Sequence, residues 1–163
     1  MRLFIAIRLT DELQSVLAET MHLLKKAGVK GSYAPKQNLH LTLAFLGEVQ
    51  DPEAVREVLG RIKYKPFRLS FSETGAFGDI VWAGVKGNQG LAAAVKDIRA
   101  ALDAAGINYD RKKFVPHITL IRKAAGKWQA VPAPKGDMMV KSISLMKSDV
   151  RDGKRVYTEL FSI

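Results

Sequence analysis

Two short segments of this chain carry the same pattern, and this repeat constrains the fold more than any other feature. His40-Leu41-Thr42-Leu43 lies in an apolar stretch, and His117-Ile118-Thr119-Leu120 follows 77 residues later. Side chains alternate between the two faces of a β-strand. Each segment is therefore predicted to be a strand that buries its aliphatic residues and presents a histidine and a threonine together on the opposite face.

The surroundings of the two segments repeat as well. Each is preceded by an apolar run, the start of a helical pattern and a glycine: Leu3–Ile7, Thr10 and Gly28 in the first copy, and Val81–Val85, Asn88 and Gly106 in the second. These three features are offset by 78 residues, one more than the histidines. Two copies indicate an internal duplication, with the second copy starting near residue 80, and not a solenoid of many repeats.

The remaining elements follow from local patterns. Thr10, Asp51 and Asn88 are good N-caps for three helices, which we expect to end near Ala27, Ile62 and Gly106. The alternating segment Pro66–Ser72 predicts a half-buried strand. We also expect a turn at Gly75–Asp79, and a terminal hairpin of Met138–Ser148 and Arg155–Phe161 around Asp152-Gly153.

The composition is that of an ordinary globular protein with a strong excess of positive charge. The chain has 163 residues, of which 47% are hydrophobic, and no low-complexity linker divides it. Its net charge of +10 favours an anionic partner, most often nucleic acid. There is no cysteine, hence no disulfide and no thiolate nucleophile. The first apolar run is too short for a signal peptide or a membrane span, so we expect a cytoplasmic protein without membrane contact. We also expect a monomer, although nothing in the sequence determines the oligomeric state.

Two His-x-Thr strands that face each other would form a site for acid–base chemistry. With an ordinary pKa of about 6.5, one imidazole can act as a base while the other, protonated, acts as an acid. The threonine hydroxyls and a nearby cation can hold the oxygens of a phosphodiester as charge develops. Such a site needs no metal or other cofactor, and we expect none. Metal binding by His40 and His117 alone is a weaker alternative, because most sites use three or more ligands.

The two motifs and their flanks resemble the 2H phosphoesterase superfamily, which is named for such a pair of histidines. More closely, they resemble the RNA 2′,3′-cyclic phosphodiesterases, also called 2′-5′ RNA ligases. The resemblance covers essentially the whole chain and is carried by four segments: Met1–Ile7, Asn38–Val49, Val81–Val85 and Phe114–Arg122.

This resemblance implies an α+β fold with two pseudo-symmetric lobes in one domain, residues 1–163. Each lobe would be an antiparallel sheet with helices packed on its outer side, and the active-site cleft would lie between the lobes. It implies hydrolysis of a terminal 2′,3′-cyclic phosphate of RNA to a 2′-phosphomonoester and, in some members, the reverse 2′-5′ ligation. His40 would be the proton donor and His117 the proton acceptor, although the pseudo-symmetry lets the two exchange roles. Thr42 and Thr119 would bind the phosphate.

Two further residues occupy matching positions, five residues after each histidine. The resemblance implies that this region contacts phosphate or base. We therefore expect such a contact from Arg122 and a stacking surface from Phe45, with plain core packing as the alternative for Phe45. Strict alternation would place both opposite the histidines. Either each strand twists or bulges there, or these side chains reach the cleft from its end.

Two other functions remain open at this point. One is a 2H phosphodiesterase that acts on 2′-5′ oligonucleotides or small cyclic nucleotides. The other is an RNA- or nucleotide-binding module that has kept the pocket without turnover, which the presence of both histidines and both threonines disfavours.

Overall fold

The computed structural model describes residues 1–163 as an α+β fold of two antiparallel sheets and three α-helices, as predicted at that level. Two single turns of 3-10 helix, η1 (Lys36–Asn38) and η2 (Trp128–Ala130), lie in its loops. In chain order the other elements are β1 (Arg2–Arg8), α1 (Asp11–Lys26), β2 (Lys30–Tyr33), β3 (His40–Glu48), α2 (Pro52–Gly60), β4 (Phe67–Phe77), β5 (Ile80–Val85), α3 (Gln89–Ala104), β6 (His117–Ala125), β7 (Asp137–Val140), β8 (Ser144–Arg151) and β9 (Lys154–Ser162).

All three helices begin at the predicted caps. The side-chain oxygens of Thr10, Asp51 and Asn88 each accept the backbone N–H three residues later, at 3.3, 3.3 and 2.9 Å. Gly28 and Gly106 follow α1 and α3 with φ of +87° and +71°, a conformation that glycine adopts without strain. Local capping chemistry therefore places the helix boundaries correctly.

The sheets mix the two sequence copies. The four-stranded sheet has the order β3-β1-β8-β9, and the five-stranded sheet has the order β2-β6-β5-β4-β7. Each motif strand lies beside the first strand of its own copy, β3 on β1 and β6 on β5. The third strand comes from the other copy, since β8 pairs with β1 and β4 pairs with β5.

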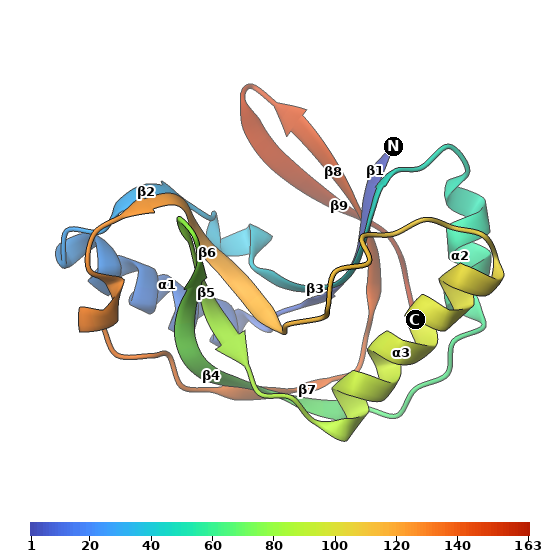
Figure 1. The fold of residues 1–163 in the computed structure, drawn as a ribbon, viewed down its shortest axis with the longest axis horizontal. Coiled ribbons are helices and arrows are strands. Elements are labelled where there is room, and N and C mark those ends of the chain that lie inside the picture. Colours follow the sequence, from blue (N-terminus) through green and yellow to red (C-terminus); the bar gives the residue numbers. More distant parts are fainter.

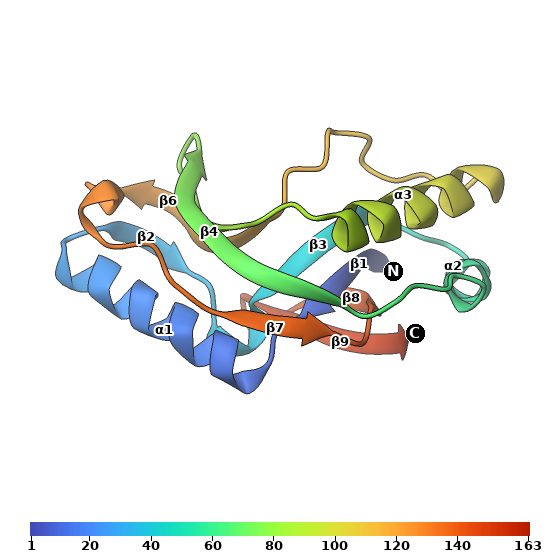
Figure 2. The same ribbon diagram turned by 90° about the horizontal axis from the view of Figure 1, so that it is seen from below.

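The helices lie at opposite ends of the molecule (Figures 1 and 2). Helix α1 lies along the five-stranded sheet, where Leu13 on the helix and Phe71 on β4 both lie close to Gly136. Helices α2 and α3 lie together beside the four-stranded sheet; the guanidinium of Arg56 on α2 is 4.8 Å from the ring of Phe161 on β9. The β8–β9 hairpin extends beyond the rest of the sheet (Figure 1).

A β-bulge occurs at the same position of each motif strand. In the β1–β3 ladder Ile5 pairs with Ala44 and Ala6 with Thr42, so Leu43 is the extra residue. Leu43 and Ala44 consequently both point into the core, each 1% exposed. After this bulge, Phe45 lies on the same face of the strand as His40 and Thr42.

The second motif strand repeats this arrangement. Val81 pairs with Ile121 and Trp82 with Thr119, so Leu120 is the extra residue. Leu120 and Ile121 are both fully buried, and Arg122, which follows them, is exposed. A bulge, one of the alternatives left open by the sequence, therefore returns Phe45 and Arg122 to the faces that carry the histidines.

Two predicted elements are wrong. The turn expected at Gly75–Asp79 is shorter: β4 continues to Phe77, because Gly75 lacks a Cβ and lets the indole of its partner Trp82 lie across it. The single strand expected at Met138–Ser148 is two strands of different sheets, because residues 141–143 lead the chain from one sheet to the other. The hairpin turn at Asp152-Gly153 is confirmed, with φ of +51° and +74°.

A single cluster of 34 buried residues runs through both sheets and all three helices. The predicted inner residues of β3, Leu41 and Leu43, are 0% and 1% exposed. No helix has the combination of length and apolar character that crossing a membrane requires.

Candidate active site

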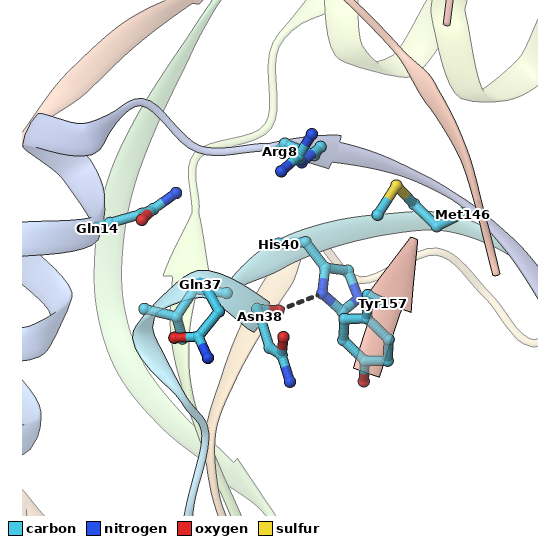
Figure 3. Close-up of a pocket in the computed structure, with 8 residues that line it drawn as sticks. Arg8, Gln14, Gln37, Asn38, His40, Met146 and Tyr157 are labelled. Carbon is cyan, nitrogen blue, oxygen red and sulfur yellow. Dashed lines mark hydrogen bonds between the residues drawn. The ribbon is translucent and has the colours of Figure 1, made fainter. Parts of the chain in front are cut away.

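His40, the first residue of β3, is fixed at both ring nitrogens. Its Nδ1 lies 2.7 Å from the carbonyl oxygen of Asn38, a contact that requires Nδ1–H to donate (Figure 3). In the neutral imidazole, Nε2 therefore carries the lone pair. That atom lies 2.9 Å from Oγ1 of Thr42, two residues further along the same face. The predicted pairing of His40 with Thr42 is thus present as a direct contact.

His117, the first residue of β6, is oriented in the same way. Its Nδ1 lies 2.6 Å from the carbonyl oxygen of Val115, so Nδ1–H donates and Nε2 is again the free nitrogen. Thr119 lies half-buried on the same face of the strand. It makes no hydrogen bond to His117, so the second motif is more open than the first.

Aromatic rings enclose His40. The ring of Phe4 on β1 lies 4.8 Å from the imidazole, and that of Tyr157 on β9 meets it edge-on at 5.3 Å. Figure 3 shows the imidazole between Asn38 and Tyr157. These rings exclude water from one side of His40 and fix its orientation.

His117 has an equivalent enclosure. Phe77 on β4 lies 5.0 Å from its ring, edge-on, and Trp82 on β5 lies 5.8 Å away. Trp82 follows Phe4 by 78 residues, the offset of the repeat. None of these four aromatic residues was predicted from the sequence to belong to the site, although the repeat matches Phe4 with Trp82.

The electrostatics of His40 indicate that residues of both sheets act on one site. Burial is the main cause that lowers the pKa of His40 below its ordinary value of 6.5. The hydrogen bond to Asn38 opposes this, while the positive charges of Arg122 and His117 lower the pKa further. Both residues belong to β6, so the structure brings the two motifs within electrostatic range of each other.

Phe45 lies on the face that carries His40 and packs against a small cluster of buried residues, which consists of Phe4, Ala6 and Met146. The guanidinium of Arg2 is 4.8 Å from its ring centre. The ring is therefore half-buried beside the site, with a cation above one side.

A pocket extends the site behind His40 (Figure 3). Besides His40, its lining includes polar side chains that were not predicted from the sequence, namely Arg8, Gln14, Gln37 and Asn38. Arg8 pairs with His40 in the β1–β3 ladder. The other predicted residues, Thr42, Thr119, Arg122, Phe45 and His117, do not line this pocket.

The structure contains no group of three or more His, Cys, Asp or Glu side chains that could hold a metal ion. The chemically active groups of the candidate site are two imidazoles whose Nε2 atoms make no bond to the backbone, two hydroxyls, of which that of Thr42 contacts Nε2 of His40, and the cation of Arg122. This set has the groups needed to move protons at a phosphodiester, chemistry that would fit a phosphoesterase.

Comparison with known proteins identifies the family. A family model described as the 2′-5′ RNA ligase superfamily matches residues 8–152. The RNA 2′,3′-cyclic phosphodiesterase of Escherichia coli K12 is 32% identical over 168 residues, covering 98% of this chain and 93% of its own length. The corresponding protein of Archaeoglobus fulgidus is 36% identical over 131 residues, covering 75% of this chain and 72% of its own. The chain therefore belongs to the 2′-5′ RNA ligase superfamily and, within it, to the RNA 2′,3′-cyclic phosphodiesterase family.

Solved structures agree with this assignment. The crystal structure of E. coli LigT in its apo form matches with a TM-score of 0.85 and 31% identity, covering 99% of this chain and 95% of LigT. LigT complexed with 3′-AMP matches with a TM-score of 0.82 at the same identity and coverage.

Proposed function

We propose that this protein hydrolyses the terminal 2′,3′-cyclic phosphate of RNA to a 2′-phosphomonoester by two-histidine acid–base catalysis without a metal ion. The family assignment supports the substrate class, because the relatives described above are RNA 2′,3′-cyclic phosphodiesterases. The net charge of +10 suits a polyanionic substrate.

One observation carries the proposed mechanism. Each histidine donates Nδ1–H to the carbonyl two residues before it, so that Nε2 of each is the nitrogen available for proton transfer. Two imidazoles held in the same tautomer on two related strands provide one base and one acid once one of them is protonated.

In the proposed reaction, Nε2 of His117 takes a proton from water while the water oxygen forms a bond to phosphorus. The bond between phosphorus and O3′ breaks, and protonated His40 gives its Nε2 proton to O3′. The product carries a 2′-phosphate and a free 3′-hydroxyl. With the 5′-hydroxyl of a second RNA in place of water, the same steps would form a 2′-5′ linkage.

Burial and nearby cations disfavour protonated His40 in the free protein. A bound phosphodiester offsets this effect, because its negative charge stabilises the imidazolium. Substrate binding would therefore help to charge the proton donor.

The other predicted residues have supporting roles in this proposal. Thr42 and Thr119 donate their hydroxyls to the non-bridging oxygens, and Arg122 neutralises charge on the phosphate as the transition state forms. Phe45, on the His40 face, offers a ring edge or face to the terminal base.

We further propose that residues 1–163 act as one bilobal, monomeric domain, with helices outside the sheets and the cleft between them. The exchange of β4 and β8 between the sheets supports a single folding unit, because neither copy contains a whole sheet. RNA as the substrate agrees with the cytoplasmic location expected from the sequence.

The test is incubation in EDTA with an oligoribonucleotide that ends in a 2′,3′-cyclic phosphate, followed by assignment of the product. The proposal expects a 2′-phosphate, lost in His40→Ala and in His117→Ala. A 3′-phosphate would mean that O2′ leaves and that the assigned roles are wrong. Absence of any product, with turnover of 2′-5′ oligonucleotides or small cyclic nucleotides instead, would move the protein to another branch of the superfamily.

A further inference from the structure

Arg99 on α3 donates to the motif strand β3 at its bulge. Its Nη2 lies 3.2 Å from the carbonyl oxygen of Leu43, the extra residue of that strand. β3 is the edge strand of the four-stranded sheet, so a carbonyl that points away from β1 has no strand to bond with. The guanidinium therefore satisfies a backbone acceptor next to Thr42.

In the other motif strand, a backbone N–H of a neighbouring strand takes the place that Arg99 has here. Leu120 is the extra residue of the bulge in β6. Its carbonyl accepts the backbone N–H of Ala34 at 2.8 Å, at the end of the neighbouring strand β2. The first copy has no strand in that place, and a side chain from α3 supplies the donor.

The same guanidinium also holds the loop that leads into the second motif. Its Nη1 donates to the carbonyl of Lys112 at 3.0 Å, and its central carbon lies 5.4 Å from the ring of Tyr109 and 5.8 Å from that of Phe114. Phe114 directly precedes Val115, whose carbonyl orients His117. One side chain thus contacts the backbone beside the first motif and the segment that anchors the second.

We propose that Arg99 is a positioning residue that fixes the two His-x-Thr segments relative to each other, through Leu43 on one side and the loop of Lys112 and Phe114 on the other. It touches no reacting atom. It acts by holding the strand that carries His40 and the loop that sets His117. The proposal rests on the proposed function only for its activity readout.

Arg111 provides a matched control on the same loop. It ties the loop to α3 through Asp103, at 2.7 Å, and lies 4.6 Å from the ring of Tyr109. It makes no hydrogen bond or ion pair with either motif strand. Comparing Arg99→Met with Arg111→Met therefore separates the positioning of the motifs from general stability of the loop.

The experiment measures kcat and KM on an oligoribonucleotide with a 2′,3′-cyclic phosphate, and hydrogen–deuterium exchange of the amides in residues 40–46 and 114–119. In Arg99→Met, kcat should fall by about 10- to 100-fold with KM within about twofold, because misplacement of the reacting groups costs rate rather than binding. Exchange should be faster in both segments. Arg111→Met should change neither kcat nor the exchange of these two segments.

Arg99→Lys keeps the charge but can reach only one of the two carbonyls, and it carries the same test if Arg99→Met fails to fold. Equal kcat and equal exchange in the Arg99 and Arg111 variants would overturn the proposal. If the unsubstituted protein does not hydrolyse the cyclic phosphate, the proposed function fails, and the exchange measurement alone decides the role of Arg99: faster exchange in both segments supports it, and unchanged exchange overturns it.

Discussion

Arg122 on the five-stranded sheet acts on His40 on the four-stranded sheet: its charge adds to burial, the larger cause, in lowering the pKa of that imidazole. The two residues come from different copies of the repeat, 82 positions apart. The bulge at Leu120 makes this interaction possible, since it returns Arg122 to the face of β6 that carries His117. The site is therefore coupled across the two sheets.

This coupling predicts the pH response of an Arg122→Met variant. Removing the cation removes a charge that opposes protonation, so the pKa of His40 should rise. If His40 is the proton donor, the basic limb of the kcat/KM profile should move to higher pH. NMR titration of the His40 ring in the free protein measures the shift directly. Lys123→Met is the control, since the adjacent Lys123 does not contribute to the pKa shift of His40. An unchanged His40 midpoint in Arg122→Met would contradict the coupling.

The lowered pKa of His40 also predicts how stability depends on pH. The unfolded chain binds a proton at about the ordinary value of 6.5, while the folded protein binds it only at lower pH. The contribution of neutral His40 to the free energy of unfolding is therefore complete above about pH 6.5. It is lost as the pH falls through the folded-state pKa of His40. Thermal unfolding followed between pH 8 and pH 5 should show this loss, and His40→Gln should reduce it. Asp103 does not affect stability in this pH range. The hydrogen bond from Arg111 lowers the pKa of Asp103 below the ordinary 3.8, so its contribution to stability changes only in more acidic solution.

Replacement of either site histidine should abolish most of the activity. We expect His40→Ala and His117→Ala each to lower kcat by about 10²- to 10⁴-fold, the usual contribution of one acid or base. His22 is the matched control, because it is the third histidine of the chain and lies exposed on α1. Equal activity of the His22→Ala and His117→Ala variants would remove His117 from the mechanism.

The features that the sequence predicted correctly are those that depend on a few neighbouring residues. The caps at Thr10, Asp51 and Asn88 are local chemistry, and so is the turn at Asp152-Gly153. The pairing of His40 with Thr42 follows from strand alternation alone.

The features that the sequence could not give depend on long-range packing. Nothing in the repeat shows that β4 and β8 change sheets, because strand partners are chosen by the whole core. The bulges at Leu43 and Leu120 break the strict alternation that would have placed Phe45 and Arg122 opposite the histidines, and the sequence alone did not decide between a bulge and an approach from the end of the cleft. Arg99 had no motif to mark it, since its role arises from the missing neighbour of β3.

The last prediction concerns Gly75, which makes room for the indole of Trp82 beside His117. A Cβ at this position would overlap the six-membered ring of Trp82, which is itself packed against Phe77 and His117. Gly75→Ala should therefore displace the indole, at a cost of about 1–3 kcal/mol in the free energy of unfolding, and lower kcat through the altered position of His117.

Thermal unfolding and kinetics of Gly75→Ala check this prediction, with Gly87→Ala as control, because a Cβ at Gly87 meets no atom within 4 Å. A double variant, Gly75→Ala with Trp82→Phe, tests the cause. The smaller ring makes room for the methyl group, so the two substitutions together should cost less than the sum of their separate effects. If the two costs in the free energy of unfolding simply add, the loss in Gly75→Ala does not arise from contact with Trp82. The prediction that this contact supports His117 would then be wrong.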